Sequence, residues 1–163
     1  MIYITLSLTL LWVITLIYAQ KKHKNKYAWQ DTAISKYISH DRFLQLGFVS
    51  LALGLALAGF AFASTPYALP LFAISGIGAL FVMLTETIID NQRLHIVSAG
   101  ITYGLALIAC VLVSWTHPFL LGVAVTNIIY VIFGAVVQDE VGDKERYSAL
   151  GLITWFGLAA ILL

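Results

Sequence analysis

The sequence has few charged residues and a single cysteine, and each shortage excludes a class of protein. Only 10% of its 163 residues are charged, whereas an ordinary soluble domain has about a quarter. The lone Cys110 leaves no partner for an intramolecular disulfide and no pair for thiol redox chemistry. A net charge of +1 argues against a nucleic-acid-binding protein, which would carry a basic stripe. Because 61% of the residues are hydrophobic, we predict an integral membrane protein.

Six apolar stretches are long enough to cross a bilayer, which takes a helix of roughly 17 to 25 mostly apolar residues. They cover residues 2–19, 43–63, 68–85, 96–115, 119–137 and 147–163. Pro66 lies in the short connection before the third stretch and Pro118 in the one before the fifth, and proline suits the start of a helix. We therefore predict an all-α fold, a single bundle of six transmembrane helices over residues 1–163.

All nine basic residues lie in alternate connections, and this placement predicts how the chain is oriented. They fall within residues 20–42, at Arg93, and at Lys144 and Arg146. Because basic residues in short loops stay in the cytoplasm, both termini are expected outside. No Lys or Arg precedes the first apolar stretch, which favours a retained anchor over a cleaved signal peptide. The expected location is the inner (cytoplasmic) membrane, crossed several times.

The connection at residues 20–42 combines a lysine-rich run with helical spacing of apolar residues. Trp29, Ala33 and Tyr37 share one helical face, which fits an amphipathic helix lying in the inner membrane interface. A loop anchored by the two aromatic residues in the interfacial belt fits equally well. The lysines are explained by membrane orientation and by attraction to anionic lipid.

Polar side chains gather at the predicted cytoplasmic ends of the spans. The set comprises His40, Asp41, Arg42, Glu86, Asp90, Arg93 and His95. The structural interpretation is that these are solvated helix-end charges that pair with arginines, with Asp41 favoured near a helix amino terminus by the helix dipole. A pocket for lipid headgroups or small anions is a second interpretation, and a zinc-like metal or catalytic centre is a third. No HxxxH, HExxH or paired-cysteine spacing is present, so no metal is assigned.

Two histidines and one asparagine invite more specific hypotheses. His40 and His95 are the residues that bis-histidine haem ligation would use, although both lie near span ends. Asn127 is the clearest polar residue within a span, with Thr126 beside it and Tyr130 three residues on. We interpret Asn127 as an interhelical hydrogen-bond donor.

Small residues at four-residue intervals predict close contact between helices. Gly100 and Gly104 form a GxxxG pattern, and Ser50, Gly54 and Ala58 repeat at the same interval on the second span. Such stripes let helix backbones approach one another. We expect both to serve packing within this chain, with a dimer face as the alternative.

Three segments together resemble an uncharacterised family of bacterial and archaeal membrane proteins, domain of unknown function 998. They are the segment from Tyr37 to Gly54, the segment from Thr85 to His95, and Glu145-Arg146 opening a span that contains Trp155. The resemblance covers the chain from about Tyr37 onward. The family has a Phe-Pro-Thr-Asp-like segment before a histidine that opens the next helix. Here Leu84-Thr85-Glu86-Thr87 and Asp90 stand in that place, and His95 is the best-matched residue. The resemblance implies an architecture and no mechanism.

The leading prediction is a small accessory or binding protein whose cytoplasmic polar rim binds lipid headgroups or a partner membrane subunit. The alternative is a membrane-embedded, metal-dependent enzyme acting on lipid at the inner leaflet, with Glu86, Asp90, His40 and His95 as ligands or acid and base groups. A haem-binding electron carrier is the third hypothesis. The expected partners are the lipid bilayer and other membrane subunits or a second copy, and no nucleic acid. Cofactor and enzymatic status stay open at this point.

Overall fold

The computed structural model describes residues 1–23, 41–89, 91–137 and 141–163. Within these ranges the side chains of residues 20, 23, 130–131, 133–137 and 141–148 are not described. The described residues are helical apart from short turns, and they contain no strand. An all-helical fold is expected in lipid, where each backbone N–H and C=O must find its partner within the chain.

Six long helices make up the described structure. They are α1 (Ile2–His23), α3 (Arg42–Ala61), α4 (Ala68–Leu84), α5 (Gln92–Ser114), α6 (Pro118–Val137) and α7 (Val141–Leu162). A single π-helical turn, η1 (Thr85–Ile89), follows α4 directly. The predicted apolar stretches all fall within these elements or at their edges. However, α1, α5 and α7 continue beyond the apolar residues by several positions, because helical hydrogen bonding carries on into polar flanks.

The helix starts follow local capping chemistry. Asp41 caps α3 by accepting hydrogen bonds from the backbone N–H groups of Phe43 and Leu44, and Asn91 caps α5 in the same way. Pro118 is the first residue of α6, as predicted. Pro66 lies in the turn two residues before α4 begins, so the expectation that it opens that helix is wrong. Tyr67, between Pro66 and the first residue of α4, has φ 66° and an exposed side chain.

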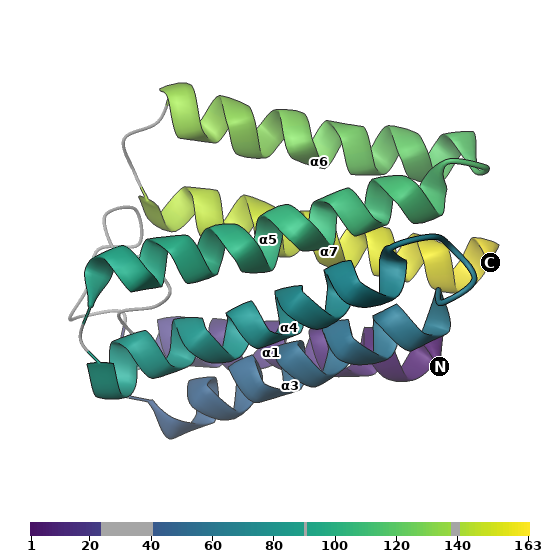
Figure 1. Cartoon of the computed structure of the whole chain (residues 1–163). Coiled ribbons are helices and arrows are strands. Elements are labelled where there is room, and N and C mark those ends of the chain that lie inside the picture. Colours follow the sequence, from purple (N-terminus) through teal and green to yellow (C-terminus); the bar gives the residue numbers. More distant parts are fainter. Residues whose placement is uncertain (24–40, 90, 138–140) are drawn as a thin grey trace.

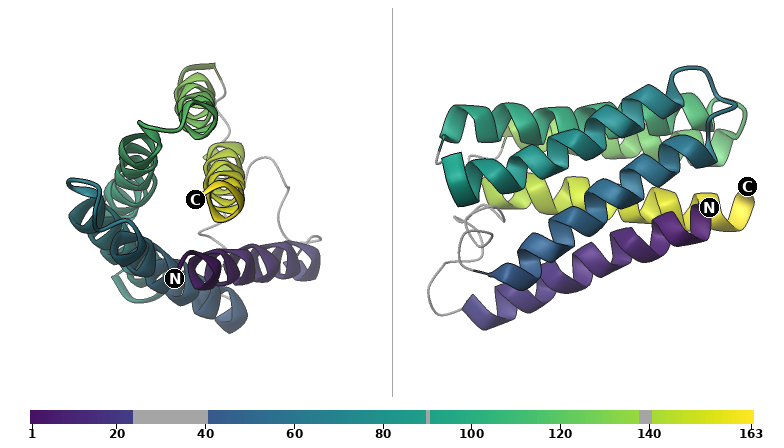
Figure 2. Two further views of the ribbon diagram at one scale, coloured as in Figure 1. Left: turned by 90° about the vertical axis from the view of Figure 1, so that its right-hand side faces the viewer. Right: turned by 60° about the horizontal axis from the view of Figure 1, so that its bottom comes forward.

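The helices run side by side with both chain termini at the same end (Figure 1). Seen along the bundle, α1, α3, α4, α5 and α6 follow one another in a curved row, and α7 lies on its concave side (Figure 2, left). Neighbours in this row pack together, and α7 contacts α6, α1 and α5. The chain therefore closes on itself, with its last helix, α7, between α1 on one side and α5 and α6 on the other.

Four of the helical segments are long and apolar enough to cross a membrane: Ile2–Ala19, Arg42–Ala61, Ala68–Ile89 and Gln92–Ser114. Two shorter apolar segments, Pro118–Ile129 and Ala149–Leu162, lie in α6 and α7, where part of each helix is outside the described side chains. Large apolar side chains are exposed along the length of the bundle, including Leu53, Ile77, Ile108 and Ile129. Such a surface is stable against lipid rather than water, so the chain is a multi-pass membrane protein.

Several glycines lie where neighbouring helices approach closely. A Cβ added to Gly54 on α3 would come within 3.5 Å of atoms of α1, and one added to Gly76 on α4 would lie 2.7 Å from the backbone oxygen of Ala52. Gly78 meets Thr102 of α5 in the same manner. The prediction that the stripe containing Gly54 serves packing within the chain is confirmed at that residue.

The GxxxG pattern on α5 has no such role inside the chain. Gly100 and Gly104 are both exposed, and a Cβ added at either would meet nothing within 4 Å. The expectation that they pack against another helix of this chain is therefore wrong. Both patterns place small residues four positions apart, but Gly100 and Gly104 lie on an exposed face of α5.

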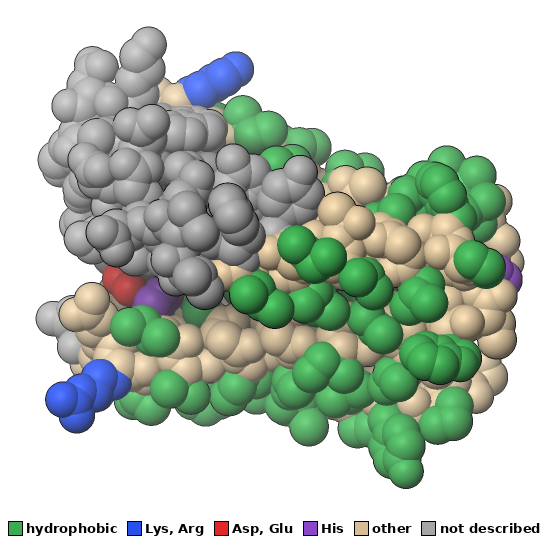
Figure 3. Space-filling model, turned by 90° about the horizontal axis from the view of Figure 1, so that it is seen from above, with side chains coloured by type: hydrophobic (Ala, Val, Ile, Leu, Met, Phe, Trp, Pro, Cys, Tyr) green, Lys and Arg blue, Asp and Glu red, His purple; other side chains and the backbone are tan. Residues whose placement is uncertain are grey.

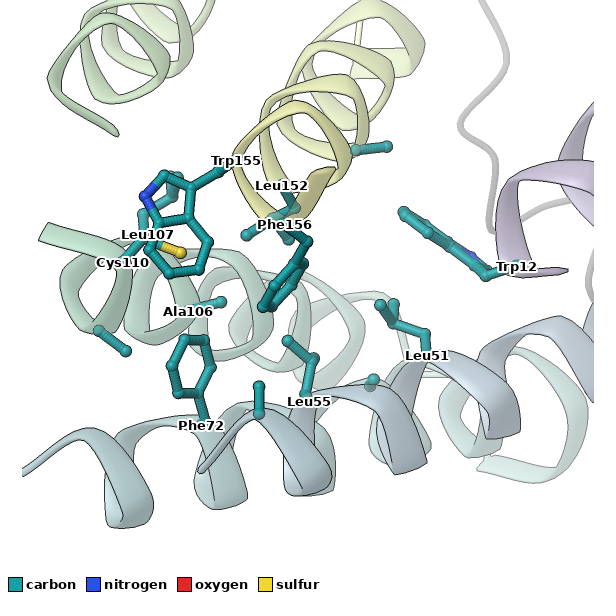
Figure 4. Packing of buried hydrophobic residues seen from close by; sticks show 14 of the residues in the cluster. Trp12, Leu51, Leu55, Phe72, Ala106, Leu107, Cys110, Leu152, Trp155 and Phe156 are labelled. Atoms are coloured by element: carbon teal, nitrogen blue, oxygen red, sulfur yellow. The ribbon is translucent and has the colours of Figure 1, made fainter. Parts of the chain in front are cut away.

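An aromatic cluster from α7 and α4 lies within the core. Trp155 and Phe156 project from α7 toward Phe72 of α4, with Leu55 of α3 beside them (Figure 4). The Trp155 and Phe156 rings meet edge-on with centroids 5.3 Å apart, and Phe156 lies 5.9 Å from Phe72. Such contacts stabilise a pair by about 0.5–1.5 kcal/mol beyond the area they bury. This cluster ties the last helix to the middle of the curved row.

Hydrogen bonds across the core join specific helix pairs. The indole N–H of Trp155 donates to Ser114 Oγ at 2.8 Å, and Ser75 Oγ donates to the backbone oxygen of Thr102. Asn127 Nδ2 donates to the backbone oxygen of Gly151 at 3.0 Å, which joins α6 to α7. The predicted role of Asn127 as an interhelical donor is confirmed. Tyr130, which the sequence placed near it, lies outside the described side chains.

Candidate functional site

Ionised side chains of the described residues occur at one end of the bundle, which we call the charged end. It is formed by the last turn of α1, the start of α3, η1 and the start of α5. The residues are Lys21, Lys22, Asp41, Arg42, Glu86 and Arg93. Figure 3 shows basic, acidic and histidine side chains at this end, while the rest of that face is mainly hydrophobic and has a histidine at the opposite edge. The opposite end holds both termini and the two hairpin turns.

The first polar contact at the charged end joins α1 to α3. Lys22 Nζ donates to Asp41 Oδ2 at 3.0 Å, while the other carboxylate oxygen, Oδ1, accepts from the N–H groups of Phe43 and Leu44 at 2.9 and 3.4 Å. The Asp41 side chain is 1% exposed and that of Lys22 is 50% exposed. A buried anion fixed by a helix cap therefore holds a cation that still faces solvent.

Electrostatics favour the charged form of Lys22. The hydrogen bond to Asp41, followed by the negative charge of that carboxylate, raises the pKa of Lys22 above its ordinary value. The ammonium also lies 5.6 Å from the centre of the Tyr18 ring, within range of a cation–π contact. Lys22 is thus a permanent cation at physiological pH.

A groove opens beside this ion pair, with a volume of about 810 Å³. Its lining residues are Ile14, Tyr18, Lys22, Asp41, Arg42 and Phe43. Tyr18 and Phe43 both line it, and their rings meet edge-on with centroids 5.3 Å apart. The groove therefore combines an apolar wall, which continues down α1 toward Ile14, with two basic residues.

The second polar contact joins η1 to α5. Glu86 Oε1 lies 3.2 Å from His95 Nδ1, and Thr85 Oγ1 lies 3.3 Å from the same nitrogen. His95 is 7% exposed, Thr85 is 1% exposed, and the Glu86 side chain is 23% exposed. A buried imidazole is thus held between a hydroxyl and a carboxylate at the point where α4 becomes a π-helical turn.

The predicted polar rim is therefore divided between two helix junctions. Asp41 pairs with Lys22 and Glu86 with His95, whereas the sequence interpretation paired these carboxylates with arginines. Asp41 is also buried rather than solvated. Arg93 is exposed in the first turn of α5. His40 and Asp90 lie outside the described residues.

Comparison with known proteins gives no relative. No family model, curated protein or solved structure matches this chain. The resemblance to the domain of unknown function 998 family stays a prediction, as do the metal and haem hypotheses. Among the residues that the structure describes, no group of three or more His, Cys, Asp or Glu side chains is placed to hold a metal ion.

Sequence reasoning left four residues of these contacts out of the candidate site: Tyr18, Lys22, Phe43 and Thr85. Tyr18 and Lys22 are four residues apart, so they share a helical face once α1 is known to continue past residue 19. The sequence did not predict that α1 extends beyond residue 19, because the apolar stretch ends at Ala19. Thr85 carried no usable signal, since its contact with His95 depends on the π-helical turn.

Proposed function

We propose that this chain is a six-span protein of the cytoplasmic membrane whose charged end binds phosphate-bearing lipid headgroups of the inner leaflet. Both termini are then outside, and the positions of the nine basic residues support this orientation. The observation that carries the proposal is the groove between α1 and α3, where two basic residues stand above an aromatic and aliphatic wall.

The chemistry of the groove suits a phospholipid better than a free small anion. An ammonium has three N–H donors, and Lys22 gives one to Asp41, which leaves donors for a phosphate oxygen. Arg42 adds a guanidinium that bonds phosphate in a bidentate manner. Below them, Ile14, Tyr18 and Phe43 offer apolar surface to the upper part of an acyl chain. A free phosphate would leave that wall unused.

Asp41 has a positioning role in this proposal. Its carboxylate is nearly fully buried and fixed by the α3 cap, so it holds Lys22 in a fixed position at the groove. Lys22, Arg42 and Asp41 together carry a net charge of +1, and Lys21 beside them adds another positive charge. The mouth therefore attracts an anionic headgroup, and the attraction is screened by salt.

The test compares anionic with zwitterionic lipid on purified protein in a neutral detergent. Thermal stability and native mass spectrometry are measured while phosphatidylglycerol or phosphatidylcholine is titrated in. We expect phosphatidylglycerol to bind more tightly, and Lys22→Gln to weaken that binding about fivefold, since one basic residue near anionic lipid contributes about 1 kcal/mol. Arg42→Gln is expected to act in the same direction.

Lys21→Gln is the matched control. Lys21 is adjacent in sequence and exposed, but it does not line the groove. A general effect of charge would weaken lipid binding equally in Lys21→Gln and Lys22→Gln. Equal effects, or equal affinity of the wild type for the two lipids, would refute the groove as a headgroup site.

A further inference from the structure

The basic residues of the groove between α1 and α3 offer many hydrogen-bond donors to a phosphate. Lys22 has N–H groups beyond the one that it gives to Asp41 Oδ2, and the Arg42 guanidinium has five. A phosphodiester is bonded to carbon groups on both sides, so it has two terminal oxygens. A phosphomonoester is bonded on one side and has three. A phosphate with three terminal oxygens therefore uses more of these donors.

The rest of the groove offers little to a polar group beyond the phosphate. Ile14 and Phe43 are apolar, and Tyr18 has a single hydroxyl. The side chain of Asp41 is 1% exposed, with Oδ2 bonded to Lys22 and Oδ1 accepting from N–H groups of the α3 cap. An ammonium or a set of hydroxyls on a headgroup would therefore meet no exposed carboxylate among the lining residues. The lining suits a phosphate that ends the headgroup.

We infer that the lipid bound in this groove is a phosphomonoester, whose phosphate is attached to the lipid on one side only. This rests on the proposed function, since it names the class of lipid that the same site takes. At pH 7 such a phosphate carries a charge of about −1.5 to −2, against a single negative charge for a phosphodiester. The additional charge lies beside two cations, Lys22 and Arg42, and both stabilise it.

The additional charge makes the preference for a phosphomonoester depend on pH through the ligand. The second pKa of a phosphomonoester is about 6, and the cations of the groove lower this pKa in the bound state. The advantage over a phosphodiester is therefore complete above pH 7 and is lost as pH falls through the bound value.

Protein groups would change the preference in the opposite direction. The groove is lined by the charged groups Lys22, Arg42 and Asp41 and by the phenol of Tyr18, while the side chains of residues 24–40 lie outside those described. Any protein group that binds a proton on acidification makes the groove more positive. That would strengthen binding of the more highly charged lipid, so a loss of preference at low pH reports the titration of the ligand.

Competition binding on the full-length protein in a neutral detergent tests the lipid class. Dioleoyl phosphatidic acid, a phosphomonoester, or dioleoyl phosphatidylglycerol, a phosphodiester, displaces a fluorescent phosphatidylglycerol at about pH 8 and about pH 5, which bracket the second pKa of the phosphomonoester. The acyl chains are the same, so only the headgroups differ. We expect phosphatidic acid to bind about fivefold more tightly at pH 8, from one added charge near basic residues, and less than about twofold more tightly at pH 5. Inorganic phosphate, which leaves the apolar wall unused, should compete weakly.

Two variants connect the preference to the groove. Lys22→Gln removes one of the two cations and should reduce the preference at pH 8 to about twofold. Lys21→Gln is the matched control, because Lys21 is adjacent and exposed but does not line the groove, and it should keep the preference of the wild type.

The possible failures are distinguishable. Equal affinity of the wild type for the two lipids at pH 8, or a preference of the same size at both pH values, would overturn the phosphomonoester; the headgroup site would stand if Lys22→Gln still weakened binding of both lipids. If Lys22→Gln changed neither affinity, the headgroup site itself would fail. Competition by inorganic phosphate as strong as that by phosphatidic acid would show that the groove takes free phosphate, and would overturn the lipid ligand.

Discussion

Two glycines in similar helices allow the cost of close packing to be measured directly. Gly76 lies in α4 against α3, and a Cβ there would lie 2.7 Å from the backbone oxygen of Ala52. Carbon and oxygen atoms in helix interfaces normally stay about 3.3–3.6 Å apart. Gly76→Ala must therefore push α3 and α4 apart by about 0.6 Å or more. No rotamer change relieves the contact, because the obstructing atom belongs to the backbone.

Gly100→Ala provides the reference for this measurement. Gly100 is also within a helix, but a Cβ there meets nothing within 4 Å. Both substitutions gain up to about 1 kcal/mol of helix propensity. The difference between the two variants then isolates the overpacking cost, which we expect at about 1–3 kcal/mol. Gly100→Ala should be neutral or stabilising, and Gly76→Ala should be destabilising.

Reversible unfolding in mixed micelles, with a denaturing detergent as the titrant, gives the two free energies. Helix content and intrinsic tryptophan fluorescence serve as independent probes, since a shared transition supports two-state analysis. Equal stability of Gly76→Ala and Gly100→Ala would refute the close approach of α3 to α4. A destabilised Gly100→Ala would show instead that its exposed face has a packing partner.

Two further outcomes follow from polar contacts. Ser114→Ala leaves the buried indole N–H of Trp155 without its acceptor and should cost about 1–3 kcal/mol of unfolding free energy. Ser7→Ala, at an exposed helix position, should cost little, and the same unfolding assay distinguishes the two variants. Asp41→Asn should keep the α3 cap but lose the charge that raises the pKa of Lys22. A raised folded-state pKa contributes stability below the unfolded value of about 10.4 and loses it as pH rises through the folded value. The stability gap between wild type and Asp41→Asn should therefore be constant from about pH 7 to 10 and close above that, and a gap that grows with alkaline pH would contradict the pairing.

The helical fold follows from the sequence because lipid leaves few alternatives. A run of apolar residues that cannot hydrogen-bond to solvent must form a helix, so the apolar stretches were located within a few residues. The helix ends were less predictable. α1 continues four residues past Ala19 to His23, and α7 begins at Val141 although its apolar residues start later. The length of a helix depends on its backbone hydrogen bonds, which the hydrophobicity of the sequence does not indicate.

Packing could be predicted only in part, because a small residue does not reveal which way it faces. Gly54 and Gly100 each belong to a four-residue repeat of small residues. Gly54 contacts α1, whereas Gly100 lies on an exposed face of α5. Both faces of a membrane helix are apolar, so the hydrophobic pattern that orients a helix in a soluble protein is weak here.

The sequence predicted that charges gather at one end of the bundle, but it did not predict the pairs that they form. The positions of the basic residues identified the end of the bundle where charges gather. Asp41 and Lys22, however, are 19 residues apart and on different helices, and the sequence between them gives no measure of their distance. The Glu86–His95 contact is nearer in sequence, but it depends on a π-helical turn that no residue pattern predicts.

The two pairs differ in burial, and this difference argues for different roles. Ion pairs with an exposed partner contribute little to stability, because water screens them and ordering a long side chain costs entropy. Lys22 is such a partner, and Asp41 caps α3 through Oδ1, the carboxylate oxygen that does not bind Lys22. An exposed cation held in place by a buried anion is useful when something outside the protein must meet it in a fixed position. His95 and Glu86 instead hold two segments of the chain together where solvent access is small. Removing Lys22 should therefore change what the protein binds and leave its fold intact, whereas removing His95 should change how firmly η1 is held against α5.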